Sequence, residues 1–182
     1  MTSDDDLLEL ARRFEEQALA EIYDRYNQGI YRYACRLLGN TDLAEECVSE
    51  TFSRMLIALS QGKGPRKYLQ AYLYRVAHNW ITDQYRREPQ PTLPLKTEFH
   101  SNPGLGPDEA LTAANEQQAV RAALAKLTPD QRQVIVLKYI EGWRNREIAQ
   151  ALEKPMGAVK ALKHRAVNAL RRHLDVDDEV LK

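Results

Sequence analysis

The chain has few cysteines, few glycines and no long apolar run. Only two of its 182 residues are cysteines, Cys35 and Cys47, and neither belongs to a CxxC pair or a His/Cys cluster. These absences exclude the familiar cysteine-based metal sites, so we expect no metal and no cofactor. We expect both thiols to be buried and reduced.

The longest apolar run is far too short to cross a bilayer, and the first residues do not resemble a signal peptide. We therefore expect a cytoplasmic protein with no membrane insertion of its own. Outside a few places proline and glycine are scarce, and the remaining composition is typical of helices.

Charge is segregated along a chain whose 26 bases and 26 acids cancel. Residues 1–61 carry a net charge of −6, residues 62–88 carry +4, and residues 108–174 carry +5. Two separate basic segments suggest two contacts with one polyanion, whereas the acidic first segment suggests a protein partner.

Residues 89–107 hold five prolines and two glycines in nineteen positions, so they cannot form a long helix. This length is typical of an interdomain tether rather than of a loop inside one domain. We predict an all-α protein of two small helical domains, residues 1–88 and 108–175, joined by this flexible linker. Residues 176–182 form an acidic tail.

The second domain has the pattern of three helices ending in a helix-turn-helix. Thr128 is a plausible N-cap with Pro129 at the first helical position, and Gly142 ends that helix. Asn145 can cap a short helix, and residues 153–155 form the turn that follows it.

The last helix has an apolar stripe and a cationic remainder. The stripe consists of Val159, Leu162, Ala166 and Leu170. A charged helix face is usually only solvated, but residues 141–174 carry a net charge of +5 in a neutral chain. A short helix, a tight turn and a cationic helix is the geometry that enters a DNA major groove.

The first domain also reads as helices. We predict one over residues 7–38, broken near residues 17–19 and at Gly29, and a second that Thr41 or Asp42 caps. A third spans residues 68–87 and mixes aromatic with basic side chains. We expect Trp80 of that helix to pack in the core. Its candidates for exposed nucleic-acid contact are Asn79, Thr82, Gln84, Arg86 and Arg87.

Three segments in order resemble one family. These are ECVSETFSRML at residues 46–56, LYRVAHNWITDQYRR at residues 73–87, and the helix-turn-helix at residues 127–174. The chain resembles the extracytoplasmic-function (ECF) group of the sigma-70 family, bacterial transcription initiation factors. The resemblance implies that the first domain binds core RNA polymerase and recognises the minus-ten element, helping to melt it. It implies that the second domain recognises the minus-thirty-five element.

The resemblance also implies site residues and partners. The polymerase-binding positions are Glu46, Glu50, Phe52 and Arg54. The positions facing minus-ten DNA are Lys63, Arg66, Lys67, Asn79, Thr82, Arg86 and Arg87, with residues 62–67 capturing a flipped base. The positions facing minus-thirty-five DNA are Arg144, Lys160, Ala161, Lys163, His164 and Arg165. The implied partners are core RNA polymerase, promoter DNA and an anti-sigma factor.

The chain departs from the family pattern in its helix-turn-helix. The turn often reads Gly-Ile-Ser in the family, whereas Glu153 stands here at the position where glycine can take a positive φ. The recognition helix often contains Ser-Arg-Leu, which here is Ala161-Leu162-Lys163. The set of base-reading side chains is therefore unusual.

Two alternatives stay open at this point. A helix-turn-helix regulator that is not a polymerase subunit would share the second domain, but its partner domain usually alternates strands with helices. An enzyme is disfavoured because Asp24, Glu46 and His78 are scattered across polar helix faces and form no nucleophile–base arrangement.

Overall fold

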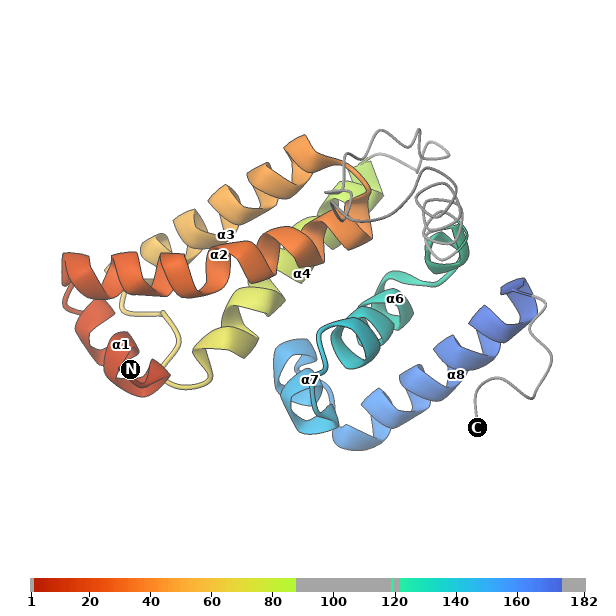
Figure 1. Ribbon diagram of the computed structural model, residues 1–182. Helices are drawn as coiled ribbons and strands as arrows, with labels where there is room; N and C mark the ends of the chain where they lie inside the picture. Colours follow the sequence, from red (N-terminus) through yellow and green to blue (C-terminus); the bar gives the residue numbers. More distant parts are fainter. Residues whose placement is uncertain (1, 88–118, 120–121, 175–182) are drawn as a thin grey trace, which may run out of the picture.

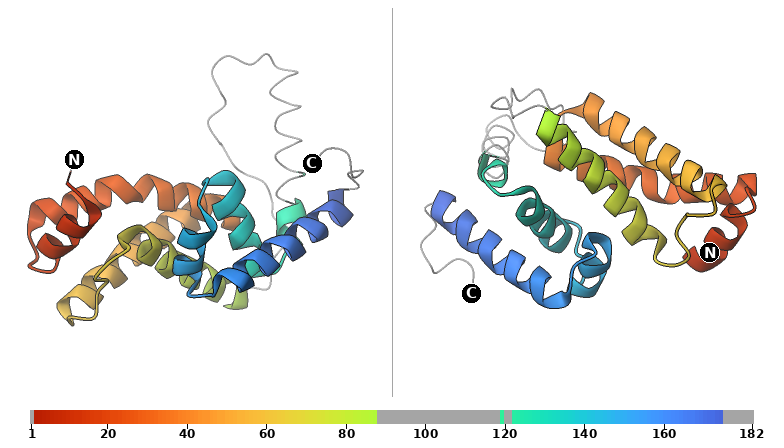
Figure 2. Two further views of the ribbon diagram at one scale, coloured as in Figure 1. Left: turned by 90° about the horizontal axis from the view of Figure 1, so that it is seen from below. Right: turned by 180° about the vertical axis from the view of Figure 1, so that it is seen from behind.

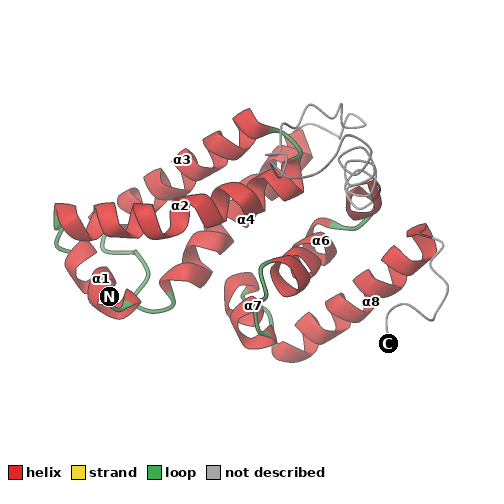
Figure 3. Cartoon of the chain, viewed as in Figure 1, coloured by secondary structure: helices red, strands yellow, loops and turns green. Residues whose placement is uncertain are grey.

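A computed structural model describes residues 2–87, 119 and 122–174 of the chain (Figure 1). Every regular element in these ranges is a helix, and no strand occurs among them (Figure 3). The all-α prediction is therefore confirmed. Residues 88–118 and 175–182 lie outside the described residues. The predicted linker and the predicted acidic tail both fall within these ranges.

The first domain consists of four helices. They are α1 (Asp4–Ala11), α2 (Glu16–Leu38), α3 (Thr41–Ser60) and α4 (Leu69–Arg87). Helices α2, α3 and α4 pack on one another, and α1 packs against α2. Ser3 caps the start of α1, and the Asp4 carboxylate joins α1 to α2 because it accepts from the Tyr26 hydroxyl at 2.5 Å and from the Arg25 guanidinium at 2.9 Å.

The long first helix breaks at a different place from the one predicted. The break lies at residues 12–15, where Phe14 has a φ of +59°, and not at residues 17–19. Helix α2 continues through Gly29 without interruption. A Cβ at Gly29 would lie 2.8 Å from the Tyr74 hydroxyl oxygen, so this glycine permits a close helix approach instead of a break.

The cap of α3 also differs from the prediction. Asn40 is the N-cap, and its side chain accepts from the Leu43 backbone N–H at 3.0 Å. Thr41 and Asp42 therefore lie inside the first turn. Asn is a strong N-cap residue, and the preceding Gly39, at a φ of +66°, closes α2 and lets the chain reverse at once.

The second domain contains α6 (Pro129–Ile135), a π-helical turn η1 (Val136–Ile140), α7 (Asn145–Leu152) and α8 (Met156–Leu174). The Thr128 cap is confirmed, since its side chain and that of Gln131 bond reciprocally to each other's backbone N–H groups. Gly142, at a φ of +74°, follows η1 as predicted. Asn145 is not the cap of α7, because Arg144 occupies that position and its backbone N–H donates to Glu147 at 2.6 Å.

Helix α4 lies at the centre of the molecule, between the α2–α3 pair and the second domain (Figure 2). Its Tyr74 ring contacts Tyr33 of α2 at a centroid distance of 5.2 Å and Trp143 of the second domain at 4.7 Å. The two domains therefore share one continuous apolar core through these three rings.

Candidate polymerase and nucleic-acid interfaces

The outer face of α3 carries the residues expected to meet polymerase. Glu46 is exposed, and the half-exposed Glu50 and Arg54 form an ion pair at 2.8 Å, one helical turn apart. Phe52 is only 7% exposed and lies under Tyr23, with the ring centroids 4.8 Å apart. Polar side chains and the Tyr23 ring, rather than Phe52, therefore form this surface.

A shallow groove of about 440 Å³ runs between α2 and α3 beside this face. Its lining residues are Tyr23, Asn27, Gln28, Tyr31, Glu45, Val48 and Ser49. The residues on the α2 side of this groove lie outside the three motifs that carry the family resemblance. The signal was present, because Tyr23, Asn27 and Tyr31 recur every four residues and so lie on one helix face.

The loop before α4 presents three cations to solvent. Lys63, Arg66 and Lys67 are all exposed, and Gly62, at a φ of +68°, lets the chain turn tightly after α3. Tyr68 follows them with a φ of +59° and 56% of its surface exposed. An exposed aromatic ring beside three cations suits an unpaired nucleic-acid strand. The sequence pattern alone places Tyr68 at the start of a helix, whereas it precedes α4.

Helix α4 divides the candidate minus-ten residues into two sets. Asn79, Arg86 and Arg87 are exposed, whereas Thr82 is half-buried and its hydroxyl lies 3.3 Å from the His78 Nε2 atom. Trp80 is 5% exposed and packs in the core, as predicted.

The prediction that His78 lies on a polar helix face is wrong, since the residue is 8% exposed. Burial lowers the pKa of His78 to about 4, and the nearby Asp130 carboxylate opposes this shift. The imidazole is therefore neutral near pH 7. The charge of Asp130 is balanced instead by the Lys154 ammonium at 3.1 Å.

The recognition helix α8 shows the predicted division between buried and exposed faces. Val159 and Ala166 are fully buried, while Leu162 and Leu170 are half-buried against the core. The candidate minus-thirty-five residues Arg144, Lys160, Ala161, His164 and Arg165 are exposed, and Lys163 is half-buried.

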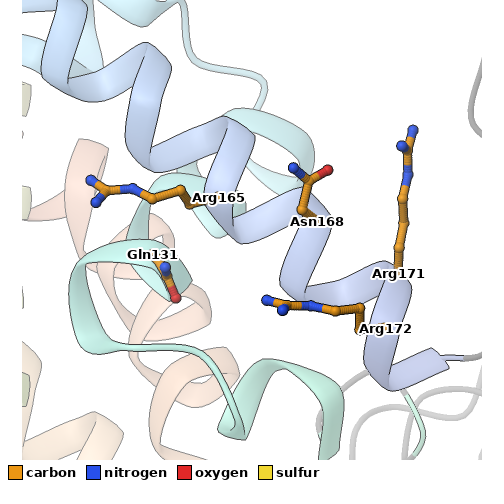
Figure 4. Close-up of a pocket in the computed structure, with 5 residues that line it drawn as sticks. All are labelled: Gln131, Arg165, Asn168, Arg171 and Arg172. Atoms are coloured by element: carbon orange, nitrogen blue, oxygen red, sulfur yellow. The ribbon is translucent and has the colours of Figure 1, made fainter.

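The far half of α8 forms a cationic groove with α6, of about 560 Å³ (Figure 4). The lining residues are Gln131, Arg165, Asn168, Arg171 and Arg172. Arg165 and Arg172 extend from α8 towards α6 in the close-up. Three guanidinium groups and two amides suit phosphate oxygens. Asn168, Arg171 and Arg172 were absent from the predicted site, although basic residues crowd the last turn of this helix.

Both cysteines are buried and neither forms a disulfide, as predicted. Burial raises the pKa of the Cys47 thiol to about 12, so this thiol is a packing group and a poor nucleophile. In the part of the chain that the structure describes, no three His, Cys, Asp or Glu side chains are grouped so that they could hold a metal ion. Across that same part, each helix is too short or too polar to span a membrane.

Comparison with known proteins places both domains. Residues 22–89 match the family model Sigma-70 region 2, and residues 117–170 match Sigma-70, region 4. The chain is 32% identical over 174 residues to the ECF RNA polymerase sigma factor SigW of Bacillus subtilis, covering 90% of this chain and 92% of SigW. The chain belongs to the ECF sigma factors.

Other ECF sigma factors agree in sequence and in fold. SigL of Mycobacterium tuberculosis is 31% identical over 157 residues, covering 86% of this chain and 89% of SigL. The solved structure of CnrH with the cytosolic domain of CnrY has a TM-score of 0.71 and 26% identity, covering 96% of this chain and 99% of that one.

An ECF sigma factor is a transcription initiation factor that binds RNA polymerase and promoter DNA. The chain therefore has this function, and the resemblance drawn from its three motifs is confirmed. The alternative, a helix-turn-helix regulator outside the polymerase, is not favoured because region 2 accounts for most of the first domain.

Proposed function

We propose that the two domains divide initiation between them. Helix α3 binds core polymerase through Glu46, Glu50 and Arg54. The loop at residues 62–67 and the exposed residues of α4 contact the minus-ten element. Helix α8 reads the minus-thirty-five element through Lys160 and Ala161, and its later cations contact phosphates. The observation that carries this proposal is the separation of one acidic face and two basic faces onto different helices.

The α3 assignment is tested by reversing charge on its surface. A Glu46→Lys, Glu50→Lys variant is expected to lose most of its association with core polymerase, because Glu46 is exposed, the Glu50 side chain is 40% exposed, and neither supports the core. Phe52→Ala is a poorer test, since removing a buried ring would also disturb packing. Asp5→Lys, Glu9→Lys on α1 is the matched control, because it makes the same charge change at two exposed positions and Glu9 is ion-paired to Arg13 one turn away.

The measurement is co-elution with core polymerase, alongside a circular dichroism spectrum of each variant. Unchanged association of the double variant at native helix content would refute the α3 assignment. Loss of association by the α1 control would show that overall charge, and not this face, governs binding.

The promoter assignments are tested by run-off transcription. Core polymerase with the purified chain is expected to transcribe a subset of a randomised promoter library, and that subset is expected to share two elements. A selected set with only one shared element would refute the division of labour between the domains.

The remaining assignments follow from membership of the ECF group. We propose that the chain works in the cytoplasm, where bacterial RNA polymerase is found, and that it acts by binding and without catalysis or a cofactor. CnrH was solved with the cytosolic domain of CnrY, and the Bartonella quintana factor RpoE with an anti-sigma factor. By analogy we propose that this chain also has an anti-sigma partner. Co-purification from the native cell would identify it.

A further inference from the structure

One side-chain hydrogen bond lies on the recognition helix itself. The amide nitrogen of Asn168 lies 3.1 Å from the Nε2 atom of the His164 ring. The two residues are four positions apart on α8, so they lie on the same helix face, about one turn from each other. His164 is exposed and belongs to the candidate minus-thirty-five residues, whereas Asn168 is half-buried.

Asparagine is a poor residue for the interior of a helix, because its side chain competes for the backbone. Asn168 nevertheless lies well inside the 19-residue helix α8. Its amide bonds to the His164 ring, and in Figure 4 it points away from Gln131, while Arg165 and Arg172 extend towards α6. The contact with the histidine therefore accounts for this side chain better than helix stability does.

The contact fixes which ring nitrogen of His164 carries the proton. An amide nitrogen donates hydrogen bonds and does not accept them, so Nε2 is the acceptor. A neutral imidazole has one bare nitrogen and one N–H group, and the proton is therefore on Nδ1. Helix α8 contains no acidic residue whose carboxylate would draw the proton to Nε2 instead. The other edge of this exposed ring thus presents a donor.

A fixed donor distinguishes among the bases in a major groove. Guanine presents N7 and O6 as acceptors, adenine presents N7 and thymine presents O4, whereas cytosine presents only its N4 amino donor. An Nδ1–H group therefore bonds to any of the first three bases and meets another donor at cytosine. A histidine free to change tautomer would instead accept from the cytosine amino group. Fixing the proton makes a permissive side chain selective, because it disfavours the wrong partner.

The neighbouring side chains of α8 leave this role to His164. Ala161 has no polar group, and Leu162 packs against the core. Lys160 and Lys163 carry ammonium groups on long flexible stems, which act as point charges and have little directional preference. The planar ring of His164, held by a partner one turn away, is the more directional reader.

We propose that Asn168 is a positioning residue for promoter selection. It holds the His164 ring with the proton on Nδ1, and that N–H group disfavours cytosine at one position of the minus-thirty-five element. The proposal rests on the proposed function, because it assumes that α8 enters the major groove of that element. Asn168 itself touches no base and acts through His164.

The hydrogen bond is removed by Asn168→Leu, which has a similar size and a higher helix preference, so helix content is expected to persist. His173→Leu is the matched control, because it places a leucine at an exposed position further along the same helix. His164→Ala removes the ring, and a fourth protein combines it with Asn168→Leu. In that pair a direct contact of Asn168 with DNA would persist, whereas a role through the ring would vanish.

The proton is located by ¹⁵N spectra of the full chain labelled on histidine, at about pH 8, where an ordinary imidazole is neutral. Protonated and bare ring nitrogens differ in ¹⁵N chemical shift, and the His164 signal is the one, among four histidines, that His164→Ala removes. We expect the proton on Nδ1 in the wild type and in His173→Leu, and a mixture of tautomers in Asn168→Leu. A proton on Nε2 in the wild type would overturn the proposal.

Selectivity is measured as binding of each protein, assembled with core polymerase, to promoters that carry each base pair in turn at every minus-thirty-five position. The wild type and His173→Leu are expected to disfavour cytosine about fivefold at one position, as for one lost hydrogen bond. Asn168→Leu is expected to bring this ratio close to one, with little change in affinity for the preferred promoter. Adding Asn168→Leu to His164→Ala is expected to change nothing further.

Three results of the binding experiment would also overturn the proposal. Unchanged selectivity in Asn168→Leu would show that the amide does not govern the reading of the base. A further loss when Asn168→Leu is added to His164→Ala would show that Asn168 contacts the DNA itself. Equal weakening on all promoters would assign both side chains to phosphate contacts. A wild type that selects no minus-thirty-five sequence would refute the proposed function instead, and the ¹⁵N spectra of the free chain would distinguish the two failures.

Discussion

The two domains bury their apolar surface in different ways. In the first, helices of 23, 20 and 19 residues pack on one another and bury large side chains such as Tyr33, Met55 and Leu73. In the second, α6, η1 and α7 have seven, five and eight residues, and Trp143 packs against Tyr74 of the first domain. The first domain thus has a core of its own, and the second completes its core on α4.

This difference predicts unequal consequences of matched core truncations. Leu73→Ala and Ile148→Ala each remove a side chain with no exposed surface, and each is expected to cost about 2–5 kcal/mol. Leu73→Ala is expected to lower the stability of both domains, because α4 supports both. Ile148→Ala is expected to lower the stability of the second domain only.

The two tryptophans separate these effects, because Trp80 belongs to the first domain and Trp143 to the second. Urea titrations followed in Trp80→Phe and Trp143→Phe backgrounds report one domain each. If Ile148→Ala shifted both transitions equally, the second domain would not be the dependent one.

The buried histidine at the domain contact makes stability depend on pH. His78 has a folded pKa of about 4 against an ordinary value of 6.5, so between these pH values the unfolded chain binds a proton that the folded chain does not. Stability is therefore full above about pH 6.5 and is lost as the pH falls towards 4, by up to about 3 kcal/mol. The polar groups facing the ring are Tyr33, Thr82, Asp130 and, through that carboxylate, Lys154.

The direction of this pH dependence is checked by thermal unfolding across this pH range. The proteins compared are the wild type, His78→Gln and His164→Gln. The loss on acidification is expected to shrink in His78→Gln and to persist in His164→Gln, whose side chain is exposed on α8. An equal loss in all three proteins would assign the pH dependence to other groups.

The DNA surfaces are compared by two substitutions on α8. Lys160→Ala is expected to cost about 1–3 kcal/mol of promoter binding and to relax discrimination at one upstream position, as for a lost base contact. Arg165→Ala is expected to weaken all promoters alike and to reduce the slope of log affinity against log salt by about one unit, because one phosphate contact is lost.

The measurement is binding of the full chain, assembled with core polymerase, to selected promoters over a salt series. Arg87→Ala on α4 serves as a comparison at the minus-ten surface. If neither α8 substitution changed binding, the cationic helix would be only a solvated face.

The smallest expected effect concerns one helix cap in each domain. Asn40→Ala and Thr128→Ala each remove a side chain that accepts from a backbone N–H, at 3.0 Å and 3.3 Å respectively, and each is expected to cost about 1 kcal/mol. Thermal unfolding checks both. A cost at Asn40 with none at Thr128 would indicate that the second domain is held mainly by its contact with α4.

Much of the local structure was predictable from the sequence. The Thr128–Pro129 start, the stop at Gly142, the turn at residues 153–155 and the buried Trp80 are all present. Each depends on a residue and its near neighbours along the chain. The break after α1 and the continuity of α2 at Gly29 were missed, because a glycine that ends a helix and one that admits a neighbouring helix look alike in sequence.

The sequence by itself determined the family, the two helical domains, and the placing of acidic and basic segments on separate helices, since these follow from composition, period and motif order. Only the tertiary structure decided that His78 is buried, that Phe52 lies beneath Tyr23, and that Glu153 reaches Arg75. Each of these depends on which surfaces meet across a long separation in the chain. Periodicity describes which face of a helix is apolar, but it does not say what that face or its polar neighbour will touch.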